Sequence, residues 1–146
     1  MAGWKHHKSI EISEKILQSF ISWKNVFAIV YKENTKVIGS LGLHNSWAND
    51  ESDYSHLKLK EVGYVLSKDY WGNGLMPEAL TAVIKFCFNI CKVDALTICH
   101  FLSNTQSKRV IEKCGFKFVK QSEYFAKQLD LTFDDMQYVL LNKENF

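Results

Sequence analysis

A strand, a glycine-bearing loop and a long apolar helix follow one another over residues 61–92, EVGYVLSKDYWGNGLMPEALTAVIKFCFNICK. The loop contains Gly72 and Gly74, and Pro77 with Glu78 opens the helix. The first N–H groups of a helix lack intrahelical partners and, with the helix dipole, attract anions such as phosphates. Glycines let a ligand approach the backbone, and proline and glutamate suit the first helical turn. The stretch therefore predicts a diphosphate site, although a single G-x-G is weak evidence by itself.

The composition indicates one domain with a sizeable core and argues against several classes of protein. The chain has 146 residues, of which 47% are hydrophobic. A net charge of +2 argues against a dedicated nucleic-acid binder. No run of about 18 apolar residues is present, so we expect no membrane span, and the polar start after Met1 predicts no secretory signal. The four cysteines form no C-x-x-C pair, and we expect them to be free and buried in a reducing cytoplasm.

Apolar spacing and turn residues predict the remaining elements. The predicted helices are residues 9–23, 77–91 and 104–114, and the predicted strands are residues 26–31, 37–43, 61–66, 93–101, 116–125 and 135–141. Ser9 or Ser13 is the candidate cap of the first helix, and Asn104 with Gly115 brackets the last. The helix 77–91 is apolar on most sides, so we expect it to be largely buried.

The order of these elements predicts the fold class. The first two strands make a hairpin, in which Gly39 and Gly42 indicate a bulge or a close neighbour. A crossover helix joins strands 61–66 and 93–101, which makes those two strands parallel. The predicted class is α/β or α+β with one mixed sheet.

Two segments together resemble the GNAT N-acetyltransferase superfamily, with the ribosomal-protein-alanine N-acetyltransferases as the closest branch. Residues 61–79, which include GYVLSKDYWGNGLMPEA, resemble that branch's strand and acetyl-CoA loop, and residues 104–116, NTQSKRVIEKCGF, resemble its second motif. The segments VFAIV, IGSLGL and DMQYVLL extend the resemblance to nearly the whole chain. It implies one GNAT-type domain over residues 1–146, with a mixed, mostly antiparallel sheet, a splayed parallel pair and flanking helices.

The resemblance also implies acetyl-CoA as co-substrate and assigns residues to it. The extended backbone of Tyr64, Val65 and Leu66 would bind the pantetheine arm like an additional strand. The pyrophosphate would bind the N–H groups of the loop, which consists of Trp71, Gly72, Asn73, Gly74, Leu75 and Met76. Asn104 and Ser107 would contact the cofactor and the departing sulfur. The alternatives are a helix N-cap for Asn104 and a solvated helix residue for Ser107.

The chain departs from the family pattern at both ends of the site. Trp71 and Met76 stand where the superfamily usually has Gln or Arg and Gly or Ala. Ile111 stands where a tyrosine often acts as the acid, so the proton for the thiolate must come from elsewhere. Family members usually begin with a further strand and helix, so we expect an N-terminally shortened chain. The exposed edge at residues 26–31 would then be covered by a second copy in a homodimer, or be irregular.

Acetyl transfer to an amine requires a neutral amine, a donor to the thioester oxyanion and a proton for the thiolate. A backbone N–H near Leu66 is the expected oxyanion donor. A free α-amine titrates at about 7.7–8.0 and a lysine at about 10.4, so a weak base suffices for an N-terminus or a small amine. Glu61 is the candidate base. The alternative is a solvent-facing strand carboxylate or the partner of a nearby lysine.

We therefore expect a cytoplasmic, acetyl-CoA-dependent N-acetyltransferase whose acceptor is a protein N-terminal α-amine or a small primary amine. The alternatives are an aminoglycoside or polyamine acetyltransferase and a non-catalytic acyl-CoA-binding or sensing module. The five histidines are scattered, so we expect no metal. The polar loop 44–58 either borders the acceptor pocket through Trp47, Asp50, Glu51 and Asp53 or is simply solvated.

Overall fold

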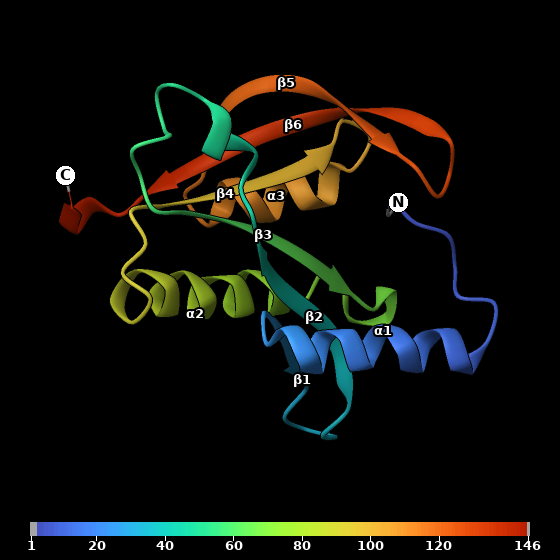
Figure 1. Ribbon diagram of the computed structural model, residues 1–146. Helices are drawn as coiled ribbons and strands as arrows, with labels where there is room; N and C mark the ends of the chain where they lie inside the picture. Colours follow the sequence, from blue (N-terminus) through green and yellow to red (C-terminus); the bar gives the residue numbers. More distant parts are fainter. Residues whose placement is uncertain (1–2, 146) are drawn as a thin grey trace.

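The computed structural model describes residues 3–145, whose six strands form one sheet in the order β1-β2-β3-β4-β6-β5 (Figure 1). The strands are β1 (Val26–Val30), β2 (Val37–His44), β3 (Leu59–Leu66), β4 (Ala95–Phe101), β5 (Lys117–Ala126) and β6 (Leu131–Leu141). The helices are α1 (Ile10–Trp23), α2 (Leu75–Asn89) and α3 (Thr105–Lys113). Neighbouring strands are antiparallel except β3 and β4, which are parallel. The predicted α/β class with a mixed, mostly antiparallel sheet and flanking helices is confirmed.

Side-chain caps set the starts of two helices, as the sequence predicts. The Ser9 side chain accepts a hydrogen bond from the Ile12 N–H at 3.4 Å and caps α1. Asn104 caps α3 in the same way through the Ser107 N–H at 3.1 Å. After α3 the chain turns at Gly115, whose φ of 90° lies in the left-handed region that favours glycine. After its cap, each of these two helices carries a stripe of apolar residues that packs on the sheet.

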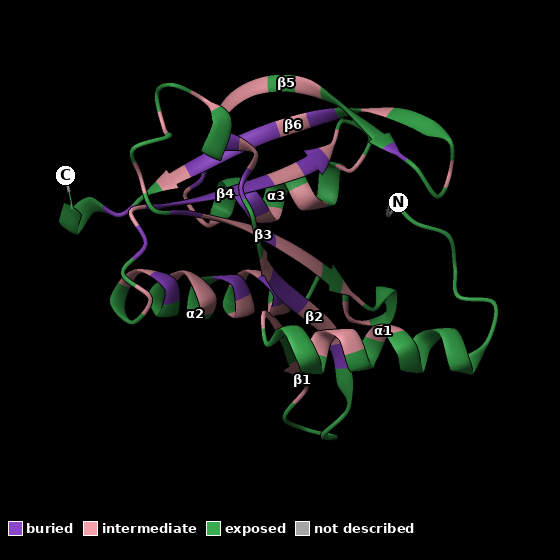
Figure 2. Ribbon diagram, in the orientation of Figure 1, coloured by how far each residue is buried: buried purple, intermediate pink, exposed green. Residues whose placement is uncertain are grey.

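The main hydrophobic core lies between the sheet and the helices α2 and α3. Figure 2 shows it as the purple stretches of β4, β6 and α2. The sheet contributes Leu41, Val62, Leu96, Ile98 and Tyr138, and the helices contribute Met76, Leu80, Cys87 and Ile111. A smaller cluster covers the opposite face of the sheet and consists of Ala48, Leu59, Ala95 and Val139. Because side chains alternate along a strand, each strand residue belongs to one of these two faces.

Helix α2 differs from its prediction in position and in burial. It begins at Leu75, ahead of Pro77, and Gly74 is its N-cap. The prediction that α2 is largely buried is wrong. Phe86 is 39% exposed, and Ile90, which follows the last residue of the helix, is 70% exposed. The sheet covers a single stripe of α2, and Phe86 reaches only the edge-strand residue Phe27, with ring centroids 5.7 Å apart. The thiols are free as predicted, but only Cys87 is fully buried.

Several strand boundaries differ from their predictions, and β4 begins at Ala95, two residues later than predicted. Strand β3 begins at Leu59, and β6 begins at Leu131 because its pairing with β5 continues to the end of the hairpin, at Ala126 and Leu131. Strand β1 is an edge of the sheet, and its register with β2 shifts between Ile29 and Val30. The expectation that a second copy covers this edge stays a prediction.

At Gly39, β2 lies very close to the backbone of β3. A Cβ atom built there would lie 2.3 Å from the Val65 carbonyl oxygen, so the expected close neighbour is present. Because that neighbour is backbone, it cannot move aside as a flexible side chain could. We predict that Gly39→Ala lowers the free energy of unfolding by about 1–3 kcal/mol in a urea titration. Ser40→Ala, at the next residue, is the control, and equal stability of the two variants would contradict the account.

Candidate active site

The parallel strands β3 and β4 separate halfway along their length. Their pairing ends at Val62 and Ile98. Beyond that point β3 stays paired with β2 as far as Leu66, and β4 stays paired with β6 as far as Phe101. Each strand thus keeps a partner on its outer side and none on its inner side. We call the resulting wedge, between residues 63–66 and 99–101, the strand opening.

The hydrogen-bond pattern shows which backbone groups of β3 face the strand opening. The Ser67 N–H donates to the Ile38 carbonyl at 2.7 Å, which marks residue 67 as directed toward β2. In an antiparallel pair the direction alternates from residue to residue. The N–H and C=O groups of Tyr64 and Leu66 therefore point toward β4, into the opening, whereas those of Val65 point toward β2. The Leu66 carbonyl also accepts a hydrogen bond from the Trp71 indole at 2.9 Å.

The loop after β3 places free N–H groups beside the opening. Gly72 and Gly74 have φ values of 78° and 72°, and a Cβ atom at either would meet nothing within 4 Å. The loop surface is thus open at both glycines. Within α2, Glu78 N–H donates to the Gly74 carbonyl, so the N–H groups of Leu75 and Met76 in the first turn precede the intrahelical ladder. This arrangement is suited to a phosphate group.

Helix α3 brings Asn104 and Ser107 to the same region as Tyr64. The Tyr64 hydroxyl donates to the Ser107 carbonyl at 3.4 Å, and burial raises the pKa of Tyr64 to about 12. The Asn104 side-chain oxygen is held by the Ser107 N–H, so the N-cap expected for Asn104 is present. Ile111, which replaces the family's frequent tyrosine, is fully buried in the main core. The expected cofactor residues thus lie around one place, the strand opening and the loop that follows it, except that the backbone groups of Val65 point away from the opening, toward β2.

Glu61 lies on the opposite face of the sheet from α2 and α3, just before the opening. Its Oε2 atom accepts hydrogen bonds from the Trp47 N–H at 3.3 Å and from the Thr97 hydroxyl at 3.4 Å. Burial raises the pKa of Glu61, and the nearby Asp135 carboxyl raises it further. The alternative of a lysine partner is wrong, because the ion pairs in residues 3–145 are Lys108–Glu112 and Lys120–Glu51. Glu61 is half-buried, so it is not a fully solvent-facing carboxylate either.

Three polar residues near Glu61 were not anticipated from the sequence. Asp135 is 7% exposed, and burial raises its pKa; Cys99, whose thiol interacts with Asp135, has its pKa raised by burial as well. Gln137 is 7% exposed, and its side-chain oxygen has no hydrogen-bond partner. These residues lie on β4 and β6, so only the strand register brings them to the face that carries Glu61. In the sequence, the alternation of polar and apolar residues in DMQYVLL, residues 135–141, was the one signal that Asp135 and Gln137 share a face of the sheet.

The loop 44–58 is partly folded onto this face and is not simply solvated. Its 3-10 turn Trp47–Asp50 buries Ala48 completely and places the Trp47 N–H on Glu61. The Lys120 ammonium lies 5.4 Å from the centre of the Trp47 ring and pairs with Glu51. Asp50 and Asp53 are exposed. The loop therefore supports Glu61 directly through Trp47.

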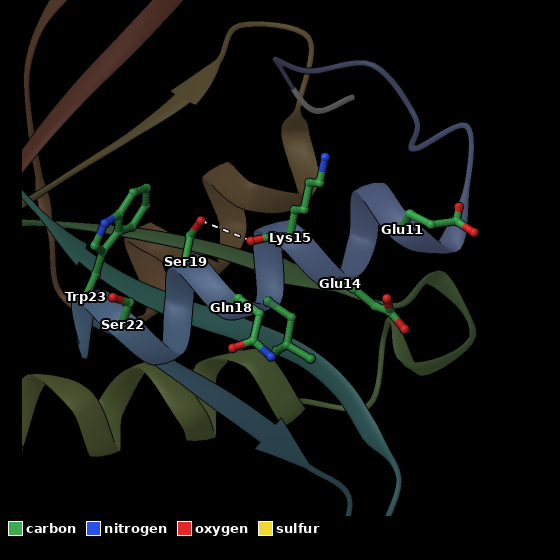
Figure 3. A pocket seen from close by; sticks show the side chains of 8 residues that line it. Glu11, Glu14, Lys15, Gln18, Ser19, Ser22 and Trp23 are labelled. Carbon is green, nitrogen blue, oxygen red and sulfur yellow. Dashed lines mark hydrogen bonds between the residues drawn. The ribbon is translucent and has the colours of Figure 1, made fainter.

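Two further hollows lie on the described surface, and one of them lies between α2 and the end of α3, lined by residues such as Thr81, Lys85 and Cys114. A shallow groove follows the outer face of α1, lined by residues such as Glu14, Gln18 and Trp23 (Figure 3). All of its lining side chains come from this one helix. Among residues 3–145, no three His, Cys, Asp or Glu side chains gather where they could hold a metal ion. No helix in the same range is long and apolar enough to cross a membrane.

Comparison with known proteins assigns this arrangement to a family. The sequence model of the acetyltransferase (GNAT) domain matches residues 1–117. The chain belongs to the GNAT acetyltransferase family. One GNAT relative, the uncharacterized N-acetyltransferase YoaA of Bacillus subtilis, is 24% identical over 124 residues. That match covers 79% of this chain and 64% of the relative, so the chain spans less than two thirds of that protein's length.

Solved GNAT structures share the fold. A ribosomal-protein-S5-alanine acetyltransferase from Vibrio fischeri superimposes with a TM-score of 0.75 at 19% identity, covering 98% of this chain and 80% of that chain. The microcin C7 self-immunity acetyltransferase MccE, in complex with acetyl-CoA and AMP, gives a TM-score of 0.68 at 19% identity and covers 91% of this chain and 69% of that chain. At these identities the likeness concerns the fold.

The burial of Glu61 has a consequence for stability that depends on pH. Because its pKa is raised in the folded chain, the folded state binds a proton at Glu61 more readily than the unfolded state does. Stability therefore falls as the pH rises from the ordinary carboxyl pKa through the folded value. We predict that Glu61→Gln melts at a higher temperature than the wild type at about pH 8, and that the difference vanishes at about pH 4. Thermal unfolding at the two pH values measures this, with the exposed Glu123→Gln as control; a pH-independent difference would contradict it.

Proposed function

We propose that residues 1–146 act as one GNAT domain that transfers an acetyl group from acetyl-CoA to a primary amine. The observation that carries the proposal is the strand opening. It presents the backbone groups of Tyr64 and Leu66 without a partner strand and leads directly to the helix start at Gly74. A chain with alternating amide groups can add there as a strand, and an anionic end can bind at the helix start.

The residues of the opening fit the parts of acetyl-CoA in this order. Tyr64 and Leu66 would hold the pantetheine amides, and the open glycine loop from Trp71 to Met76 would hold the pyrophosphate. Acetyl-CoA supplies an activated acetyl group as its thioester. The Leu66 N–H faces the opening and would donate to the thioester oxygen as charge develops there. Ser107, beside Tyr64, and Asn104 would lie near the departing sulfur.

Glu61 provides a carboxyl group beside the opening whose raised pKa suits proton uptake from an amine. An α-amine, which titrates at about 7.7–8.0, needs less assistance than a lysine at about 10.4. The proposed acceptor is therefore a protein N-terminal α-amine, as in the ribosomal-protein-alanine branch that the sequence resembles, or a small primary amine. An aminoglycoside or polyamine acceptor, and a sensor that binds acyl-CoA without turnover, are the alternatives that experiment must separate.

Binding of acetyl-CoA can be tested with a variant of the glycine loop. We predict that acetyl-CoA raises the melting temperature of the wild type and that Gly74→Val weakens its binding by at least about tenfold, since valine disfavours the left-handed backbone and crowds the helix start. Isothermal titration measures the affinity. Gly115→Ala is the matched control, because Gly115 is also left-handed but lies at the other end of α3 from Asn104. That variant should lose stability and keep its affinity.

Turnover is measured as free thiol released with a panel of amines. Thiol release with a peptide that has a free N-terminal α-amine, or with a small amine, supports the proposal. Release only with an aminoglycoside or a polyamine shows that the acceptor belongs to that class instead. Binding of acetyl-CoA without turnover on any amine identifies a sensor. Absence of acetyl-CoA binding by the wild type would refute the proposed function as a whole.

A further inference from the structure

The imidazole ring of His44 lies over two glycines that are opposite each other in the sheet. Gly42 on β2 and Gly63 on β3 are register partners. A Cβ atom built on Gly42 would lie 2.6 Å from His44 Nε2, and one built on Gly63 would lie 3.6 Å from the same atom. The ring therefore leans back along β2 and lies over a patch of sheet that has no side chains. Any other residue at position 42 would displace it.

This ring lies at the beginning of the strand opening. Gly63 is the first residue of β3 beyond the last pair with β4, at Val62 and Ile98. By the alternation of side chains, His44, Gly63 and Glu61 belong to the same face of the sheet, and His44 is the register partner of Glu61. An amine that reaches a thioester in the opening from this face would approach between the ring and β4.

We propose that His44 takes the proton from the acceptor amine in the acetyl transfer proposed above. The inference rests on that function and gives to His44 the proton-accepting role for which Glu61 was the candidate. This role could not be predicted from the sequence, because the five histidines are scattered and the position of His44 depends on the register of Gly42 with Gly63. Glu61, opposite the ring, then acts as a positioning residue.

The surroundings of the two groups favour His44 over Glu61 as the proton acceptor. The Oε2 atom of Glu61 already accepts hydrogen bonds from the Trp47 N–H and the Thr97 hydroxyl, and the residue is half-buried. His44 is exposed, so a proton that it accepts can pass to solvent after each turnover. Among the charged groups of the sheet, Glu61 is the register partner of His44, Asp135 lies beyond Glu61, and the side chain of Lys60 belongs to the opposite face. Lys24 precedes β1, and Asp50 and Glu51 follow in the loop after β2, where Glu51 pairs with Lys120.

The protons and bonds balance in the following sequence. The acceptor enters as an ammonium ion and loses one proton to the imidazole of His44. The neutral nitrogen attacks the thioester carbon, a C–N bond forms, and the C–S bond breaks with its electron pair leaving on sulfur. The nitrogen then loses its second proton, which neutralises the thiolate. His44 releases the first proton to water, so the products are the acetylated amine, free CoA and one proton.

The test compares kcat/KM across pH for the wild type, His44→Gln and Glu61→Gln, with the amine that the wild type accepts. We expect His44→Gln to lose roughly 100-fold in kcat/KM at about pH 7 and to lose the acidic limb of the profile. Its affinity for acetyl-CoA, measured by titration, should not change. Glu61→Gln should keep the limb. His56→Gln, at an exposed loop histidine, is the matched control and should behave as the wild type.

Two further variants separate a chemical role from a structural one. His44→Ala should be rescued in part by added imidazole, which a merely structural residue would not allow. Gly42→Ala moves the ring off its glycine patch while keeping it in the chain, and should lower kcat/KM without lowering the affinity for acetyl-CoA. The inference is overturned if His44→Gln keeps the pH profile of the wild type. It is also overturned if Glu61→Gln loses the acidic limb and His44→Gln does not. If the wild type binds acetyl-CoA but acetylates no amine, the proposed function fails, and this inference fails with it.

Discussion

The separation of β3 from β4 is the constraint on which the rest of the site depends. Two strands that part in a sheet leave backbone groups unpaired, which is unfavourable if those groups are buried without water. Here each strand keeps its outer partner, β2 or β6, so the separation affects only the inner side of each strand. On β3 it leaves the Tyr64 N–H and C=O groups and the Leu66 N–H without a partner strand, whereas the Leu66 carbonyl accepts from the Trp71 indole. Because Gly39 has no side chain, β2 and β3 can lie close together at the end of β3, where Leu66 is the register partner of Gly39.

The features that surround the opening follow from the same separation. The chain leaves β3 at the open end, so the glycine loop and the start of α2 lie beside the unpaired amides. It leaves β4 at the same end, so α3 begins there and Ser107 meets Tyr64. The two faces of the sheet have different roles. Helices α2 and α3 cover one face with the main core, and the other face carries Glu61, His44 and Asp135.

The elements and their order could be predicted from the sequence because they depend on local signals. Ser9 and Asn104 are good caps wherever they occur, and a crossover helix forces its two strands to be parallel. The burial of α2 was predicted poorly, because Phe86 and Ile90 are apolar whichever way they face. Hydrophobic spacing cannot show that the sheet covers a single stripe of that helix.

Apart from Asn104 and Ser107, which the family resemblance assigned, the candidate site was predicted only where it follows one stretch of chain. Residues 61–76 are continuous, so the cofactor loop and the strand before it could be found together. His44 and Asp135 come from other strands, and a shift of register by one residue would turn either of them to the opposite face. The pairing of Gly42 with Gly63, on which the place of His44 depends, is a property of the assembled sheet.

Amide hydrogen exchange at residues 64–66 tests the central claim, that the free backbone of β3 receives acetyl-CoA, most directly. In the free chain, the Tyr64 and Leu66 amides should exchange fast, and the Val65 amide, which points toward β2, should exchange slowly. Saturating acetyl-CoA should slow Tyr64 and Leu66 by at least about tenfold and leave Val65 unchanged. Tyr64 and Leu66 amides that are already protected in the free chain, or that stay fast while acetyl-CoA is bound, would contradict the account.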